Sequence, residues 1–174
     1  MKKIEIDVFS SESIENAIKQ LDSYAKEIER KTELLRIKVA ERIATEVEIG
    51  FRMATTSDMV KGSPPPNDTS VYVRNEGNTS VIVANGTQIM WIEFGAGVYH
   101  NGSVGSSPHP KGSELGMVIG GYGKGRGKRR VWGYVESEGD ELKLTRGTPA
   151  QMPMLKAVNT VLNDIPDIAR EVFK

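Results

Sequence analysis

The chain has 174 residues, and its 23 lysines and arginines equal its 23 aspartates and glutamates, so the formal net charge is zero. This length is enough for one hydrophobic core, and the balanced charge excludes a whole-molecule attraction to nucleic acid or membranes. The chain contains no cysteine, which excludes disulfides and thiolate metal sites.

Neither a secretion signal nor a membrane span is visible in the sequence. The first thirty residues lack a basic stretch followed by an apolar one. No apolar run approaches the roughly 18 residues that cross a bilayer. We therefore expect a single domain over residues 1–174, made and kept in a reducing, aqueous compartment, with no membrane partner.

A strand and a long helix are predicted at the start of the chain. Apolar and acidic residues alternate over residues 4–8, the period of a half-buried strand. Serines at positions 10, 11 and 13 then favour a helix start, because their hydroxyls can satisfy unpaired amides of the first turn. With no glycine or proline from Ser13 to Ile49, the helix should run to about Ala54 and span roughly 60 Å.

Apolar residues recur along this helix at spacings of three and four, which predicts one apolar stripe. A seven-residue repeat fails at Arg42 and Glu46, so we expect an amphipathic helix lying across another element and not a coiled coil. Because the helix is longer than a small domain's core, part of its stripe should contact another subunit, or the helix must bend or break into two. The stripe consists of Ile14, Ile18, Leu21, Ala25, Ile28, Leu35 and Val39, and it then moves to Ile43, Val47 and Phe51.

Short strands and a second helix are predicted after the prolines at 64–66. Apolar residues at 71–73 and 81–83 flank a turn at 76–78, which predicts a β-hairpin. Further strands are expected at 131–135 and around Leu142 and Leu144. A helix should close the chain within Thr148–Lys174, with a kink at Pro166 or a restart capped by Asp164. The predicted fold class is α+β, an antiparallel sheet of about four to five short strands packed by a long N-terminal helix and a C-terminal helix.

A long insertion interrupts the predicted strands. Residues 95–130 contain eleven of the eighteen glycines and both histidines, with little apolar periodicity. Loops longer than about fifteen residues are usually functional or disordered, so we expect a flexible arm. Three roles fit its basic half: phosphate contact without base reading, docking on an acidic protein partner, or no specific role. The cations concerned are Lys124, Arg126, Lys128, Arg129 and Arg130.

The sequence contains glycines and histidines, but not in the spacing that a phosphate-binding loop or a metal site needs. The alternating glycines at 121–127 lack the preceding strand and following helix that a phosphate-binding loop needs. His100 and His109 lie in the insertion with no close carboxylate, so we expect two solvated histidines and not a metal site. The chain is therefore predicted to be a non-enzyme, with no cofactor and no metal.

Glu93 is the most unusual acid in the chain, because it stands between Ile92 and Phe94 just before a glycine. A general acid or base would need a partner whose environment separates the two pKa values, and the sequence identifies none. We favour a structural carboxylate that accepts hydrogen bonds from turn amides or from an arginine of a neighbouring subunit.

Two short segments carry the strongest functional signal. Residues 90–97 are Met-Trp-Ile-Glu-Phe-Gly-Ala-Gly, and residues 148–157, Thr-Pro-Ala-Gln-Met-Pro-Met-Leu-Lys-Ala, open a helix with Pro153 in its first turn. The pair resembles the tail-completion (head–tail joining) proteins of long-tailed bacteriophages. In that family a segment ending Glu-Phe-Gly-Thr precedes a closing helix opened by Ala-x-Pro-Phe-Leu. Ala96 replaces the family's threonine here, and Met154 replaces its phenylalanine.

The resemblance implies a structural protein of the virion neck or tail, made in the cytoplasm of a bacterial host. It implies a homo-oligomeric ring, commonly a hexamer, that joins the head-side connector to tail-tube or tail-terminator proteins, with non-specific contact to passing DNA as an added option. It also implies a turn that packs the sheet against the last helix. The matching positions are Trp91, Ile92, Glu93, Phe94 and Gly95 in that turn, and Pro153, Met154, Leu155 and Ala157 at the helix start.

Two rival functions remain open. The first is a small nucleic-acid-binding protein that uses residues 120–130 as its main site and keeps its affinity as a monomer, with a steep salt dependence. The second is an antitoxin-like or regulatory dimer built on the long helix. A ring subunit would instead form concentration-dependent oligomers that survive deletion of residues 120–130.

Overall fold

The computed structural model describes residues 3–97, 108–112, 114 and 131–174. The described part is a mixed α+β fold, which confirms the predicted class. None of its helices is both long and apolar enough to cross a membrane. In chain order the elements are α1 (Ser11–Arg52), β1 (Met59–Lys61), β2 (Ser70–Glu76), β3 (Thr79–Asn85), α2 (Ile89–Phe94), β4 (Ala96–Gly97), β5 (Trp132–Tyr134), β6 (Lys143–Thr145), β7 (Gly147–Thr148) and α3 (Pro153–Phe173).

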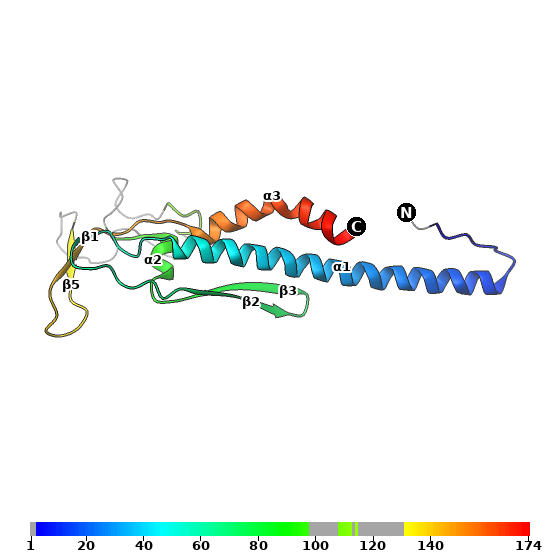
Figure 1. The fold of residues 1–174 in the computed structure, drawn as a ribbon, viewed down its shortest axis with the longest axis horizontal. Coiled ribbons are helices and arrows are strands. Elements are labelled where there is room, and N and C mark those ends of the chain that lie inside the picture. The colour runs from blue at the N-terminus through cyan, green and yellow to red at the C-terminus, as the bar shows by residue number, and fades with distance from the viewer. Residues whose placement is uncertain (1–2, 98–107, 113, 115–130) are drawn as a thin grey trace.

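Helix α1 is one continuous helix of 42 residues, so the predicted single long helix is confirmed and the alternative of two helices is wrong. Ser10 caps its start, because the Ser10 hydroxyl accepts a hydrogen bond from the Ser13 amide at 3.3 Å. Figure 1 shows α3 along one side of the C-terminal half of α1 and the β2–β3 hairpin along the other. The N-terminal half of α1 projects beyond both.

The strands pair antiparallel, but they divide into three small sheets and do not form the one sheet that the sequence predicted. The strand orders are β1-β6-β5, β2-β3 and β4-β7. The predicted hairpin is confirmed, since β2 and β3 pair from Ser70↔Asn85 to Glu76↔Thr79 around a two-residue turn. This hairpin runs along α1 whereas β1 and β5 lie beyond the C-terminal end of α1, so no common edge joins them (Figure 1).

The strand predicted at residues 4–8 is wrong. Residues 3–7 form no strand, no described strand pairs with them, and Ile6 and Val8 are 51% and 69% exposed. Alternating apolar residues make a strand only where a neighbouring strand accepts and donates the backbone hydrogen bonds. Here the fold supplies no such neighbour among the described residues.

Helix α3 continues through Pro166, so the predicted restart with Asp164 as its cap is wrong. The Asp164 carboxylate lies 3.6 Å from Nε of Arg42 on α1. Two more contacts bind α3 to α1, since Lys38 pairs with Glu171 and the Lys31 ammonium lies 6.0 Å from the centre of the Phe173 ring. Packing along α1 therefore holds the helix together where proline removes one of its own hydrogen bonds.

The core lies where the last third of α1 meets α2 and the start of α3. Val47, Phe51 and Ile92 are fully buried there, with Ala157 beside them. The helices approach closely, because a Cβ at position 50 of α1 would lie 2.8 Å from Cβ of Pro153 and only glycine leaves that space. The side chains packed around this cluster are Ile43, Ala54, Val71, Ile82, Ala84, Ile89 and Met154.

Candidate functional site

Glu93 connects the two segments that carry the sequence signal. It lies in the last turn of α2 and its side chain is almost fully buried, with 3% of the residue exposed. Its Oε2 accepts a hydrogen bond from the Met154 amide at 2.9 Å, and its Oε1 accepts one from the Leu155 amide at 3.1 Å. One carboxylate therefore binds the first turn of α3 from sixty residues earlier in the chain.

This contact replaces a missing helix cap. The first amides of a helix have no partner within the helix, and a serine, threonine or aspartate just before it usually accepts them. Here that position is Met152, which has no acceptor in its side chain and adopts a left-handed φ of 56°. Glu93 supplies the missing oxygens, and its negative charge lies at the positive end of the α3 dipole.

His109 is the third member of this junction, and the prediction of a solvated histidine is wrong for it. The side chain is buried, its ring centre lies 4.4 Å from that of Phe94, and its Nε2 lies 3.2 Å from Oε1 of Glu93. Its Nδ1 accepts a hydrogen bond from the Lys111 amide at 3.0 Å, so the proton is on Nε2 and points to Glu93. Nothing in the local sequence indicates this contact, because Glu93 and Phe94 come from a distant element.

The backbone around Gly95 closes the junction. The Gly95 amide donates to the Trp91 carbonyl at 2.8 Å and ends α2, with φ 82° and ψ 159°, a conformation essentially restricted to glycine. A Cβ here would lie 3.1 Å from both Cβ and N of Ala150. The Gln151 amide donates to the Ile92 carbonyl, and the Gln151 side chain bonds both the amide and the carbonyl of Thr55 just after α1.

The structure brings the two predicted segments together, although the first is a helix and not a turn. Four of its residues end α2 and the fifth is the glycine that follows, while the matched residues of the second segment form the first turns of α3. The five cations of the predicted basic arm lie outside the described residues, as does His100. The residues placed are Trp91, Ile92, Glu93, Phe94, Gly95, Pro153, Met154, Leu155 and Ala157.

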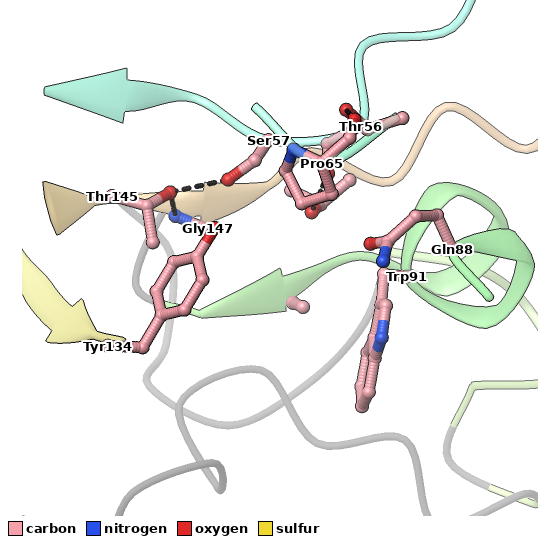
Figure 2. Close-up of a pocket in the computed structure, with 10 residues that line it drawn as sticks. Thr56, Ser57, Pro65, Gln88, Trp91, Tyr134, Thr145 and Gly147 are labelled. Atoms are coloured by element: carbon pink, nitrogen blue, oxygen red, sulfur yellow. Dashed lines mark hydrogen bonds between the residues drawn. The ribbon is translucent and has the colours of Figure 1, made fainter. Parts of the chain in front are cut away.

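A pocket of about 210 Å³ lies next to this junction. Figure 2 shows Tyr134 on one side of it and Trp91 on the other, with Ser57 and Thr145 on the Tyr134 side. The ten lining residues that the structure describes include no carboxylate and no imidazole. These ten residues therefore offer aromatic walls and hydroxyls, but no carboxylate–imidazole pair for acid–base chemistry.

The hydroxyls around the pocket have structural roles. Oγ1 of Thr145 lies 2.6 Å from Oγ of Ser57, donates to the Asp58 carbonyl and accepts from the Gly147 amide. Oγ1 of Thr148 donates to the Thr56 carbonyl at 2.7 Å. These bonds join the segment after α1 to β6 and β7, so they hold two distant parts of the chain together.

No group of three or more acidic or histidine side chains in the described part of the chain is placed to hold a metal ion. Elsewhere, beside β6, the Glu136 carboxylate lies 2.8 Å from Nζ of Lys143, and this hydrogen bond raises the pKa of Lys143. That ion pair is on the surface and includes no residue of the junction.

Comparisons with known protein families, with characterised proteins and with solved structures found no match to this chain. What indicates the function of this chain is its own motifs, the junction at Glu93, and the surfaces that the described fold leaves uncovered.

Proposed function

We propose that this chain is a structural subunit of a bacteriophage neck, which assembles into a ring and completes the tail by joining the head connector to the tail tube. The observation that carries the proposal is the contact of Glu93 with the Met154 and Leu155 amides. It unites the two segments in which the chain resembles tail-completion proteins.

A structural role agrees with the chemistry of this junction. The Glu93 carboxylate accepts hydrogen bonds from two helix amides and contacts the His109 ring, so it is not available as a base. These three contacts of the carboxylate fix α2, the segment around residue 109 and α3 relative to one another. A subunit that must transmit a fixed geometry to its neighbours needs such a rigid centre.

The surface of the molecule also favours assembly. Large apolar side chains are exposed along the N-terminal half of α1, where Ile18, Leu21 and Tyr24 are each 53% exposed. An exposed apolar surface of this extent usually marks an interface. A ring forms when head-to-tail contacts between neighbouring copies close on themselves.

The direct test is the size and shape of the purified chain. Sedimentation velocity over a concentration series, followed by negative-stain electron microscopy, should show closed rings of one diameter, with six copies as the expected number. A chain that stays monomeric at every concentration would contradict the proposal.

A deletion separates the ring from its main rival. Removing residues 120–130 should leave ring formation intact, because the junction and α1 lie outside that segment. The rival nucleic-acid-binding function predicts instead that the full chain binds duplex DNA as a monomer, with affinity that falls steeply as salt rises, and that the deletion abolishes this binding. Both variants can be compared by fluorescence anisotropy with a labelled DNA duplex.

A further inference from the structure

The apolar stripe of α1 has two parts that follow different periods. From Ile14 to Val39 the stripe keeps alternating steps of four and three residues, a strict seven-residue repeat. At Arg42 the repeat stops, and Arg42 pairs there with Glu46 and Asp164. Beyond it, Val47 and Phe51 enter the core of the fold. The repeat positions are Ile14, Ile18, Leu21, Ala25, Ile28, Thr32, Leu35 and Val39.

The repeat therefore holds where α1 is not part of its own core and fails where it is. A straight helix that packs on a globular core needs a period near 3.6 residues, whereas two helices that pack along each other need 3.5. The five positions from Ile14 to Ile28 are all exposed. A 3.5-residue period whose apolar positions are exposed indicates that another helix covers them.

The other half of the repeat forms the floor of a groove. Leu35 and Val39 line a hollow of about 380 Å³, with Ile82 of β3 on one wall and Ile165 of α3 on the other. These side chains are half-buried, and the groove continues the exposed stripe on the same face of α1. The exposed repeat positions from Ile14 to Ile28, which we call the ridge, and the groove over Leu35 and Val39 thus lie end to end on one helix.

The charges of the two halves are opposite. Residues 11–29 contain five acids against two lysines, whereas residues 30–42 contain five cations against two acids. A parallel pair of α1 helices would place acid-rich beside acid-rich and base-rich beside base-rich segments. An antiparallel pair places each acid-rich half beside a base-rich one, and it also opposes the two helix dipoles.

We propose that a second copy of this chain covers the stripe, through a two-fold antiparallel pairing of the α1 helices over residues 14–39. The ridge of each copy then occupies the groove of the other, which a parallel pair could not achieve because its two hollows would face each other. In this arrangement position 21 of one copy lies opposite position 32 of the second, and position 18 opposite position 35.

The absence of cysteine from the sequence allows a clean cross-linking test. Leu21→Cys and Thr32→Cys are both exposed positions, so neither substitution disturbs the subunit's own core. An equal mixture of the two variants should form a disulfide-linked dimer containing one of each on mild oxidation. The matched control is Ser23→Cys, an exposed residue on the opposite face of α1, mixed with Thr32→Cys.

The dimer yield in the first mixture should exceed the control by roughly tenfold or more, because bound neighbours react at high effective concentration. Equal yields in the two mixtures would overturn the pairing. Efficient linking of Leu21→Cys to itself would show a parallel pair and would also overturn it. The double variant Leu21→Cys/Thr32→Cys should give closed covalent dimers, whereas a ladder of larger species would exclude two-fold symmetry.

This inference does not rest on the proposed ring. A two-fold pair has no polarity, whereas a joint between a head and a tail must have one, so the pair cannot be the head-to-tail contact of the ring. Its failure appears as missing cross-links, and failure of the ring appears as missing closed particles in the microscope. Each result can occur without the other.

Discussion

The two halves of α1 carry similar apolar residues and end in opposite environments. Val47 and Phe51 near the C-terminal end are fully buried, whereas Ile18 and Leu21 near the N-terminal end are each 53% exposed. In the C-terminal half the hairpin, α2 and α3 cover the helix, whereas most of the N-terminal half projects beyond the hairpin and α3 (Figure 1). The same amphipathic pattern thus serves the subunit's own core at one end and, in the pairing proposed above, a second copy of the chain at the other.

The difference shows that apolar content alone does not identify a core. What separates the halves is the period of the stripe, which changes at Arg42 from seven residues to the spacing that suits packing on a globular core. It follows that substitutions of similar size should have very different effects on stability according to the half in which they lie.

Phe51→Ala should have the largest effect. The ring is fully buried in the cluster with Val47, Ile92 and Ala157, so its removal loses transfer free energy and leaves a cavity. We expect the free energy of unfolding to fall by about 4 kcal/mol, measured by urea denaturation. A loss below about 1 kcal/mol would mean that the core is not centred on the end of α1.

Glu93→Ala should come next, because it leaves the Met154 and Leu155 amides and the His109 ring without their acceptor. The expected loss is about 3 kcal/mol in the free energy of unfolding. Glu93→Gln keeps one carbonyl oxygen, so its free energy of unfolding should lie between those of Glu93→Ala and the wild type. Glu48→Ala, which removes an exposed partner of Arg52, is the control and should cost at most about 1 kcal/mol.

The surroundings of Phe51 and Glu93 differ in how much of them the local sequence predicts. The end of α1 in the core follows from spacing within one helix, and the hairpin follows from valines flanking a turn, so both could be predicted locally. The role of Glu93 as an acceptor for amides could be favoured from its position before a glycine. Which amides it accepts depends on a helix sixty residues later, and no local pattern specifies that contact.

The errors have the same cause. The strand expected at residues 4–8 lacks a described neighbour, and the restart that was one of two alternatives at Pro166 does not occur, because contacts with α1 hold α3. His109 lies in a glycine-rich insertion, and only the folded chain brings it to Phe94 and Glu93. Local propensity was overruled in each case by a partner that is distant in sequence, or by the lack of one.

Gly95→Ala should cost less than the loss of the Glu93 carboxylate. The residue would have to adopt φ 82° and ψ 159°, and its Cβ would lie 3.1 Å from Ala150. We expect a loss of about 2 kcal/mol in the free energy of unfolding. Gly77→Ala provides the comparison, because it also has a positive φ but nothing within 4 Å of its Cβ, and it should cost about 1 kcal/mol. Equal losses of unfolding free energy in the two variants would show that the close contact with Ala150 does not contribute.

Leu21→Ser should have the smallest effect on the subunit and the clearest effect on association. Because the side chain is half exposed and belongs to no described core cluster, the free energy of unfolding at low protein concentration should change by at most about 0.5 kcal/mol. At high concentration the wild type should gain stability with concentration, since pairing binds only the folded state, and the variant should lose this dependence. Ser23→Ala, on the opposite face of α1, should keep it. A wild type whose melting temperature is independent of concentration would show that the exposed half of α1 is not covered by a second copy.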